Sequence, residues 1–548
     1  MIPYIKKQKT LKDGSIIYTL PFGTHEGYYY FPANDCRPNL INYGFTGPTF
    51  LVIPDGKISA KDAVKLADET GLKNLAARNG MGISFLLPNG YSWADDPQGA
   101  YEEFADSLII ARDNFYNGLG TVMHPEDHEK IEYGILGAVV RLYVYAFGSG
   151  ADYVAKYYIK PVQKKVILGD LGRSDISMTC VTLQGGTVLP AAEKNDLHVC
   201  SVGNTPEYNK ILRKNCAELM TADELDVEGQ YKEIMGQWKR WAGAVRRVVN
   251  YDEAGIAQIP ESAIVPVSPD NPAFPRRFGP PVKEHKIGYV TFYDENLDVK
   301  HEKHPLVFVF HGGGDSSLAT SLIAEWPEIA KREGFIVVAP EAHMGITATE
   351  VIALLEHLKE EYAIDEEKVY STGFSMGGGK SWDLYEQYPQ YFAGIAPMDA
   401  TGIAVQGARL LDPEKSNQDV LVPMFYIGGC ASPLPELPKH GEASCERFRY
   451  LARVNQWKQG SEINFEDKEN WADPEICLVG EKVEHLSDEV FPQSDYVLHS
   501  FESTDGNVYT QIMAVTNHQH ELRRFTNECC WNFLKHFRRK ADGRIVIE

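Results

Sequence analysis

The sequence predicts an α/β protein with two tandem domains, each a mostly parallel sheet flanked by helices. The chain has 548 residues, and single hydrophobic cores stop growing at roughly 250 to 300 residues. Apolar runs typical of buried strands alternate with helical patterns in both halves, which is the signature of parallel sheets covered on both faces. The order of these segments also repeats from the first half to the second.

The second half shows this alternation in its simplest form. A strand and a polar turn are expected in 288–305, a buried strand in 306–310, a helix in 321–334 and a strand in 335–340. In 348–362 the apolar residues Val351, Leu354, Leu355 and Leu358 are spaced i, i+3, i+4 and i+7, which predicts one buried helix face. A further strand, 368–374, follows, and ligands of such sheets bind at the carboxyl ends of the strands.

The first half repeats the pattern in five places. The paired segments are 27–36 with 288–297, 49–56 with 306–313, 74–88 with 328–340, 141–158 with 368–389, and 236–243 with 455–460. Five pairs in the same order predict an internal duplication, although two unrelated α/β domains could converge on such patterning.

Domain boundaries follow from a proline-dense stretch. Seven prolines lie between Pro260 and Pro281, and proline cannot continue a helix or a central strand. The expected division is a first domain at 1–258, a linker at 259–282 and a second domain at 283–548. Residues 430–495, rich in Trp, Pro and charge, are expected to be an insertion, either a lid over the site or a peripheral segment.

Composition and charge exclude several classes of function. Hydrophobic residues make up 43% of the chain and the formal net charge is −22, so the surface would repel phosphate backbones and anionic membranes. Neither a nucleic-acid nor a membrane partner is expected. The absence of a signal-peptide pattern or long apolar run predicts a cytoplasmic location. Nine scattered cysteines without C-x-x-C pairs predict free thiols and no metal site.

The strongest chemical signal is Gly373-Phe374-Ser375-Met376-Gly377, between a predicted strand and a predicted helix. A sharp turn in this context exposes a nucleophilic serine at the helix N-terminus, where amides and helix dipole favour developing negative charge. We therefore expect Ser375 to be a catalytic nucleophile.

Acyl transfer by such a serine needs donors for an oxyanion. The segment His311-Gly312-Gly313-Gly314 ends a predicted strand, and a glycine turn can aim backbone N–H groups without obstruction by side chains. We expect one donor from Gly313 and the other from the amide of Met376. The alternative is a glycine turn used only for tight packing.

A general base must follow, because a serine hydroxyl is a poor nucleophile until a neighbour takes its proton. His518 and His520 lie in a turn between a predicted strand and the last predicted helix. His518 is the better candidate because it comes directly after the strand; His520 is the alternative, although it and His536 are expected to be helix or surface residues.

The acid that orients the histidine is less clearly marked. After the predicted strand 422–429 the usual Asp position holds Ser432, and Glu436 is the nearest carboxylate. Either carboxylic acid can hold an imidazole in one tautomer. Glu436 is the leading candidate and Asp399, after the preceding strand, is its rival.

These residues resemble the polyhydroxybutyrate-depolymerase and feruloyl-esterase-like branch of the α/β-hydrolase superfamily. The resemblance rests on 306–314, on 364–379, and on the closing segments 517–522 and 531–539, and it covers about residues 283–548. It implies two hydrolase-like domains and, in the second, a carboxyl ester hydrolase without metal or organic cofactor. The chain departs from the branch in lacking a signal peptide and the usual Asp.

The first half looks like a degenerate copy of the second. The alignment puts Gly148 opposite Ser375 and Asp55 opposite His311, and a glycine has no side chain with which to attack. The first domain is therefore expected to be non-catalytic. It would either shape the entrance to the second site or support a homo-oligomer.

The leading function is hydrolysis of a small or medium carboxylic ester, of the aryl, feruloyl or hydroxyacyl type, through an acyl-enzyme on Ser375. Two alternatives stay open. One is an amide or peptide hydrolase using the same residues, and the other is a non-catalytic binding or scaffold protein with the hydrolase fold.

Overall fold

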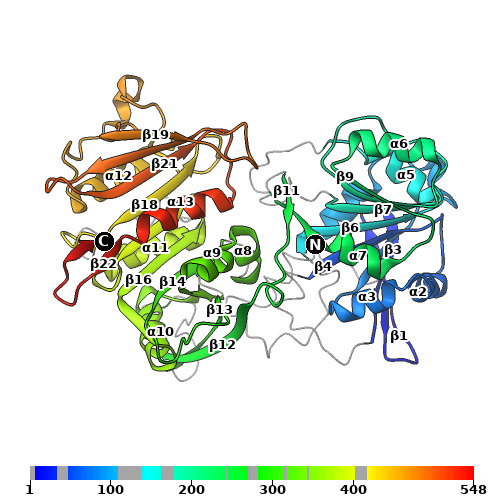
Figure 1. The fold of residues 1–548 in the computed structure, drawn as a ribbon, viewed down its shortest axis with the longest axis horizontal. Helices are drawn as coiled ribbons and strands as arrows, with labels where there is room; N and C mark the ends of the chain where they lie inside the picture. The colour runs from blue at the N-terminus through cyan, green and yellow to red at the C-terminus, as the bar shows by residue number, and fades with distance from the viewer. Residues whose placement is uncertain are drawn as a thin grey trace. The chain divides into compact units, whose positions relative to one another are not determined.

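The fold is described from a computed structural model. It describes residues 7–33, 47–108, 138–161, 178–241, 244–269, 271, 282–312, 317–341, 345–400 and 416–548. The chain divides into two compact units, the first ending at Val249 and the second running from Asn250 to Glu548. Figure 1 shows the first unit in blue to green and the second in green to red. The expected α/β class is confirmed in both.

The second unit is built on a ten-stranded sheet in the order β12-β13-β15-β14-β16-β17-β18-β21-β20-β19. Its strands are β12 (Ile256–Pro266), β13 (Glu284–Asp294), β14 (His304–Phe310), β15 (Ile336–Pro340), β16 (Ile364–Phe374), β17 (Gly394–Met398), β18 (Met424–Gly429), β19 (Lys482–Leu486), β20 (Tyr496–Glu502) and β21 (Val508–Val515). The six central strands are parallel, and antiparallel strands close both ends. The parallel strands therefore end at one edge, where a site is expected.

Helices cover both faces of this sheet (Figure 1). They are α8 (Ser317–Ala324), α9 (Trp326–Glu333), α10 (Ala348–Glu361), α11 (Met376–Gln387), α12 (Glu442–Val454) and α13 (Arg524–Leu534), with 3-10 turns at Pro389–Tyr391, Pro438–His440 and Phe465–Asn470. Helices α10, α11 and α12 pack on one face, and α8, α9 and α13 pack on the other. A small hairpin, β22 (Phe537–Arg539) with β23 (Ile545–Ile547), follows α13.

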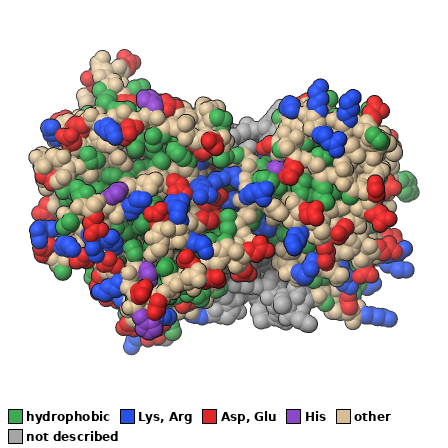
Figure 2. All heavy atoms as spheres, viewed as in Figure 1, with side chains coloured by type: hydrophobic (Ala, Val, Ile, Leu, Met, Phe, Trp, Pro, Cys, Tyr) green, Lys and Arg blue, Asp and Glu red, His purple; other side chains and the backbone are tan. Residues whose placement is uncertain are grey.

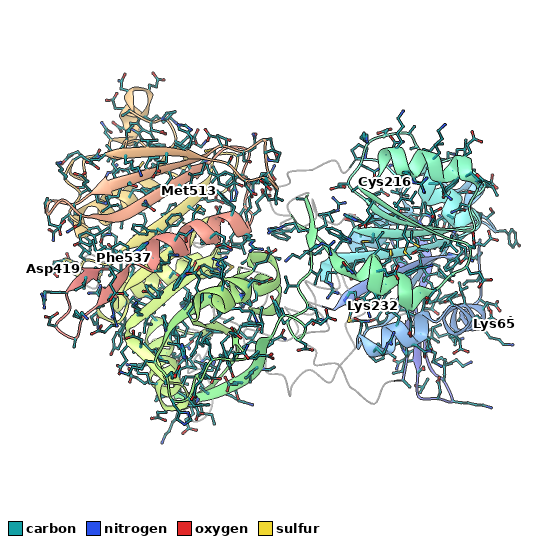
Figure 3. The ribbon with its side chains drawn as sticks, in the orientation of Figure 1. Lys65, Cys216, Lys232, Asp419, Met513 and Phe537 are labelled. Carbon is teal, nitrogen blue, oxygen red and sulfur yellow. The ribbon has the colours of Figure 1, made fainter. Side chains whose placement is uncertain are left out.

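Three of the central strands are buried along their whole length because helices cover both faces. Every residue of β15, β17 and β18 is buried, as expected for the apolar strands of a parallel sheet. The predicted helix face is confirmed, since Val351, Leu354, Leu355 and Leu358 are each at most 1% exposed. Figure 3 shows Met513 on β21, within this unit.

The predicted linker is wrong in its first part. Residues 256–266 form β12, which pairs with β13 over its whole length, including Pro260 opposite Val290 and Pro266 opposite Glu284. β12 is the edge strand of the sheet, and an edge strand needs only one side of its backbone for pairing, so it tolerates residues without an N–H. Residues 270 and 272–281 lie outside the described residues.

The expected insertion at 430–495 is also largely part of the fold. Cys445, Phe448 and Leu451 of α12 belong to the hydrophobic core, and the Phe448 ring lies 5.1 Å from that of Tyr426 on the sheet. β19 continues the sheet beside β20. Residues 442–454 and 482–486 therefore cover or extend the sheet and are not a lid.

The first unit contains a nine-stranded sheet in the order β1-β2-β3-β5-β4-β6-β7-β8-β9. The strands are β1 (Lys7–Thr10), β2 (Ile16–Phe22), β3 (His25–Phe31), β4 (Pro48–Ile53), β5 (Ile83–Leu86), β6 (Ala138–Phe147), β7 (Cys180–Gln184), β8 (His198–Val202) and β9 (Glu218–Ala222). The helices are α2 (Ala60–Glu69), α3 (Leu72–Arg78), α5 (Ser149–Tyr157), α6 (Pro206–Asn215) and α7 (Val227–Glu233), with 3-10 turns at Trp93–Asp95 and Met235–Gln237 and a hairpin of β10 (Trp238–Trp241) and β11 (Ala244–Arg247).

The two sheets share one strand order. The stretch of sheet from β2 to β9 and the stretch from β12 to β21 each begin with two strands in chain order, followed by a reversed pair, β5-β4 in one and β15-β14 in the other. The remaining strands of each stretch lie in the order of the chain. The longest parallel pairs, β4 with β6 and β14 with β16, even carry a register shift at the same end. The predicted repeat is therefore present as a repeated topology.

The sheet register corrects one detail of the predicted alignment. Ile53 pairs with Ala146, and Phe310 pairs with Gly373, the residue that the repeat places opposite Ala146. Ile53 therefore corresponds to Phe310. The residue opposite His311 is Pro54, and Asp55 corresponds to Gly312.

The exposed surface carries both signs of charge. Figure 2 shows acidic and basic side chains interspersed over the visible face of each unit. On α2, for example, Lys65 is 66% exposed and lies beside Glu69, and Figure 3 shows it pointing outward. Among the helices of the described residues, none is long and apolar enough to cross a membrane.

A buried carboxylate, Glu350, caps helix α10. It is fully buried and accepts hydrogen bonds from the amides of Ser268 and Thr347 and from Asn271 Nδ2, at 2.9, 2.9 and 2.6 Å. His285 Nδ1 lies 3.4 Å away. Burial opposes ionisation, but His285 and these hydrogen bonds lower the pKa of Glu350 to about 2. The charged form is thus stabilised by folding.

We expect Glu350→Gln to lower the free energy of unfolding at pH 7 by about 2 kcal/mol, because one amide oxygen replaces a carboxylate with several donors. A depressed folded pKa stabilises the protein above the unfolded value near 4.5, and this contribution disappears as pH falls toward 2. Urea unfolding of both proteins at pH 7 and pH 3 measures it. Glu356→Gln, at a 56% exposed position, is the control, and an equal loss in both variants would contradict the prediction.

Candidate active site

Ser375 lies at a sharp bend between β16 and α11. Its φ is 54° and its ψ is −115°, a conformation that L residues with a side chain rarely adopt. The Ser375 amide donates to the carbonyl oxygen of Met398 at the end of β17, at 2.9 Å. The bend places the serine directly before the first turn of α11, at the carboxyl edge of the parallel strands.

The glycines of the motif allow close backbone contacts. A Cβ atom on Gly373 would lie 2.3 Å from the carbonyl oxygen of Gly377, and one on Gly377 would lie 2.2 Å from that of Phe310. No side chain fits at such distances. The two glycines are therefore required for α11 to start beside the end of β14.

The predicted oxyanion donors are described only in part. Met376 is the first residue of α11, so its amide has no carbonyl acceptor within the helix. Gly313 lies outside the described residues. Among its described neighbours, Gly312 would place a Cβ 2.9 Å from Phe374 Cδ1, which puts the start of the glycine turn beside the serine bend.

A buried carboxylate, that of Glu341, lies near the described residues that flank the glycine turn. Glu341, 2% exposed, follows β15. It accepts hydrogen bonds from the amide of Ser317, at 3.1 Å, and from the Ser317 hydroxyl at the start of α8. His311 Nε2 lies 4.0 Å from the same carboxylate. Glu341 is thus hydrogen-bonded to Ser317 and lies near His311, two residues that flank the segment in which an oxyanion donor is expected.

The residue facing Glu436 is His520. The Nδ1 of His520 lies 2.5 Å from Oε1 of Glu436, and the two side chains are 3% and 1% exposed. The His520 ring lies against Phe374, with centroids 4.7 Å apart. His520 therefore stands beside the residue that precedes Ser375, with its Nδ1 turned to the acid.

Glu436 reaches this place from further along its loop than an Asp would need. Its Oε2 accepts the amide hydrogen of Gly429, the last residue of β18, at 2.8 Å. The Ser432 hydroxyl donates to its Oε1. Ser432, which stands where an Asp was expected, thus supports the carboxylate, and the longer side chain of Glu436 brings its oxygens back to the strand end.

His518 has a different partner. It is fully buried, and its Nε2 lies 3.2 Å from Oδ2 of Asp399. The predicted pairing of His518 with Glu436 is therefore wrong. His518 and His520 lie two residues apart, and their imidazoles face different carboxyl groups, Asp399 and Glu436. The expectation that His520 is a helix or surface residue is also wrong, since its side chain is buried in the turn before α13.

The environment of Asp399 disfavours the charged form of its carboxyl group. Asp399 follows β17, is 3% exposed and has a φ of 49°. Burial, together with the neighbouring Glu436, raises the pKa of Asp399 well above its usual range. The protonated form of Asp399 is therefore favoured where it lies beside Glu436.

The strand order and the positions of these groups along it identify the fold. A serine bend follows the fifth main strand, β16, a carboxylate follows β18, and the histidine turn follows β21. This order of nucleophile, acid and histidine on a parallel sheet is that of one fold. The second unit has the α/β-hydrolase fold.

Known proteins are similar to parts of this chain. No family model matches the chain. A bifunctional acetylxylan esterase/xylanase of Neocallimastix patriciarum is 30% identical over 134 residues, which are 23% of this chain and only 19% of that protein. The chain thus spans about a fifth of this curated relative.

Two solved structures are similar to parts of the chain. The acetyl xylan esterase of Aspergillus awamori matches 45% of this chain and 94% of its own, with 13% identity and a TM-score of 0.32. The feruloyl esterase module of Clostridium thermocellum matches 52% of this chain and 85% of its own, with 11% identity and a TM-score of 0.30.

The first unit repeats the bend of Ser375 with a glycine in place of the serine. Gly148 lies between β6 and α5 with φ 51° and ψ −120°, close to the values of Ser375. A Cβ on Gly150 would lie 2.4 Å from the carbonyl oxygen of Ile53. A Cβ on Gly377 would lie similarly close, at 2.2 Å, to the carbonyl oxygen of Phe310. The backbone of the elbow is preserved, and the reactive side chain is missing.

Asp55 fills the space that this bend leaves. Its Oδ1 accepts the amide hydrogen of Ser149 at 2.7 Å, and Ser149 corresponds to Met376. A Cβ on Gly148 would lie 2.3 Å from the Asp55 carboxyl carbon. The carboxylate of Asp55 thus accepts the hydrogen bond of the amide that would bind an oxyanion. It also leaves no room for a side chain at position 148.

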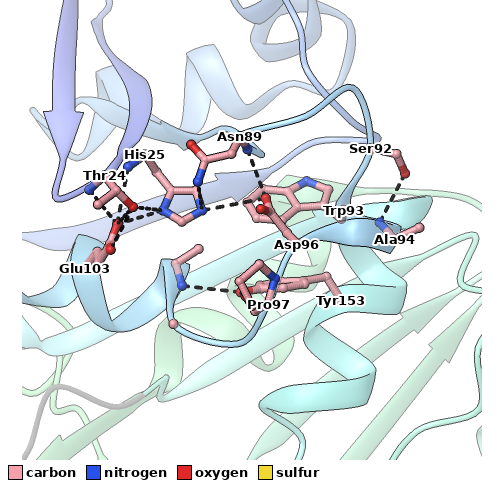
Figure 4. A network of polar contacts seen from close by, with 12 residues as sticks. Thr24, His25, Asn89, Ser92, Trp93, Ala94, Asp96, Pro97, Glu103 and Tyr153 are labelled. Atoms are coloured by element: carbon pink, nitrogen blue, oxygen red, sulfur yellow. Dashed lines mark hydrogen bonds and ion pairs between the residues drawn. The ribbon is translucent and has the colours of Figure 1, made fainter.

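A network of hydrogen bonds surrounds His25 in the first unit (Figure 4). His25, at the start of β3, directs Nδ1 to Glu103 Oε2 at 2.7 Å and Nε2 to Asn89 Nδ2 at 3.1 Å. Asp96 accepts the Asn89 amide at 3.0 Å, and Thr24 donates to Glu103. These contacts tie the start of β3 to the chain after β5, which is a structural role.

The described residues contain no cluster of three or more His, Cys, Asp or Glu side chains that could hold a metal ion. The eight cysteines within those residues are free thiols. Burial raises the pKa of several of them, including Cys200 and Cys529, to about 12. These thiols are therefore protonated at neutral pH and are poor nucleophiles.

Proposed function

We propose that the second unit is a serine carboxyl ester hydrolase in which Ser375 attacks the ester, His520 is the general base and Glu436 orients His520. The single observation that carries this is the pairing of His520 Nδ1 with Glu436 beside the serine bend. With Nδ1–H donating to the carboxylate, the imidazole is held in the tautomer whose Nε2 accepts a proton.

The reaction follows from these positions. As Ser375 Oγ attacks the carbonyl carbon, His520 Nε2 takes the hydroxyl proton, and the charge on the carbonyl oxygen is stabilised by the Met376 amide and by a donor of the glycine turn, for which Gly313 is the candidate. His520 then passes the proton to the leaving alcohol. Water attacks the acyl-enzyme by the same route and releases the acid.

The substrate is proposed to be a small or medium carboxylic ester. Its class is suggested by the acetylxylan esterase activity named for the Neocallimastix relative, so acetyl esters belong in a first substrate panel beside aryl, feruloyl and short hydroxyacyl esters. Amide analogues of the same acyl groups separate an esterase from a peptide or amide hydrolase.

We expect a fluorophosphonate probe to label the full chain with one equivalent, on Ser375 alone. The first unit should not react, because Gly148 has no hydroxyl and Asp55 occupies the amide of Ser149. Intact mass and peptide mapping measure the stoichiometry and the site. A chain that neither reacts with the probe nor hydrolyses any ester of the panel is a non-catalytic protein with a hydrolase fold, and the proposal fails.

A further inference from the structure

Two carboxyl groups lie buried side by side behind the proposed base. Asp399 and Glu436 are 3% and 0% exposed, and burial together with the neighbouring Glu436 raises the pKa of Asp399 well above its usual range. They meet because β17 and β18 are parallel neighbours, with Met398 opposite Ile427 and the Asp399 amide donating to the Ile427 carbonyl oxygen at 3.0 Å. Nothing in an ordinary catalytic triad requires the second carboxyl.

Among the described residues, more hydrogen-bond donors lie against the side chain of Glu436 than against that of Asp399. Two touching buried carboxyls do not both ionise, because like charges in a poorly solvated site repel strongly. Glu436 receives hydrogen bonds from His520 Nδ1, the Ser432 hydroxyl and the Gly429 amide. The side-chain nitrogen near Asp399 is His518 Nε2, at the longer distance of 3.2 Å.

The other charged groups around Asp399 do not reverse the rise in its pKa. Glu521 raises its pKa further, and Arg523 lowers it. Both residues come from the turn before α13, and Arg523 is bound to Glu521 at 2.5 Å and to the Ser494 and Tyr496 hydroxyls. The cation is therefore committed to another carboxylate, and burial beside Glu436 keeps Asp399 protonated.

We propose that Asp399 is a positioning residue that acts as a neutral carboxylic acid, donating its O–H to Glu436 and so holding that carboxylate against His520. This inference rests on the proposed function of the same site. A carboxylate has about four acceptor positions, and the hydrogen bond from Asp399 would complete the set around Glu436. The carboxylate then has one orientation, and it draws less strongly on the His520 proton.

The test compares Asp399→Asn and Asp399→Leu through the acid limb of the pH profile of kcat/KM, which reports the protonation of His520. Asn keeps a neutral donor, so the limb should move by less than about 0.3 pH units and kcat should fall less than about 10-fold. Leu removes the donor, which makes Glu436 a stronger base partner, so the limb should move to higher pH by about half a unit or more and kcat should fall about 100-fold.

The opposite charge assignment has an opposite signature. If Asp399 is ionised and serves His518 as the triad acid, Asn removes a negative charge near the imidazoles, so the limb moves to lower pH by about one unit and kcat falls about 10⁴-fold. That result overturns the proposal. Loss of kcat in both variants with an unmoved limb also overturns it, because it would show a packing role alone.

Three controls keep the outcomes separate. Glu350→Gln alters another buried carboxylate and should lower stability without moving the limb. Thermal unfolding shows whether the Leu variant folds; if it does not, the direction of the shift in the Asn variant alone decides. Fluorophosphonate labelling of Ser375 in the parent tests the proposed function independently, so a labelled parent with the wrong shifts rejects only the role of Asp399.

Discussion

Replacing Ser375 by Ala is expected to lower kcat for ester hydrolysis by about 10⁵-fold, because no other group can form the acyl-enzyme. Labelling by a fluorophosphonate should disappear with it. The substrate KM should change little, since the hydroxyl contributes mainly to the reacting transition state. Initial rates on the most reactive ester of the panel, together with intact mass after probe treatment, measure both effects.

The matched control for this variant is Ser149→Ala, at the corresponding bend of the first unit. Its backbone stands beside Asp55, and its loss should leave both turnover and labelling in place. The fold of the Ser375 variant should survive, because the positive φ of this position costs Ala and Ser similar amounts. Turnover that persists in Ser375→Ala, or a label that moves to another serine, would refute the assignment of the nucleophile.

The second large effect distinguishes the two neighbouring histidines. His520→Ala is expected to lower kcat by at least about 10⁴-fold, because the serine loses the group that takes its proton. His518→Ala should lower kcat by only about 10-fold, because the loss of the imidazole changes the packing around Asp399. It should also destabilise the turn in which the buried ring of His518 packs. Steady-state kinetics and thermal unfolding of both variants provide the comparison.

The contrast between these variants is more informative than either alone. His518 and His520 have the same side chain, lie two residues apart, and each faces a buried carboxyl. A larger loss of kcat in His518→Ala than in His520→Ala would make Asp399 and His518 the working pair. It would also leave the contact between His520 and Phe374 without a catalytic meaning.

Local sequence was enough to predict the bend at Ser375. The G-x-S-x-G pattern between a β-branched strand and a helix records a steric constraint, since Gly373 and Gly377 lie where a Cβ would strike backbone atoms. The buried face of α10 was predicted for a similar reason, because helical spacing alone determines which side chains share a face. Both features depend on residues within one or two turns of each other.

The proline-rich segment shows how local rules fail. Pro260 and Pro266 exclude a central strand, as predicted, but β12 lies at the edge of its sheet. Whether a strand lies at an edge depends on which other strands pair with it, and the nearest partner, β13, begins at residue 284. The sequence around the prolines carries no record of that pairing.

The acid and the base required the folded chain. Glu436 and His520 are 84 residues apart, and the alternatives Asp399 and His518 stand in the same edge of the sheet. Composition and spacing identify all four as titratable residues after strands, but not which imidazole turns to which carboxyl. Two signals were available in hindsight, namely Ser432 as a donor for a longer acid and a second histidine two residues after the first.

The sequence by itself determined the α/β class, the repeated order of strands and the bend at Ser375, because each depends on contacts between residues close along the chain. Only the tertiary structure decided that β12 is a strand, that His520 faces Glu436 while His518 faces Asp399, and that Asp55 occupies the bend at Gly148. These features depend on side chains and strands that are far apart in the sequence and meet only in the folded protein. The local sequence pattern would be the same if a side chain faced a different partner.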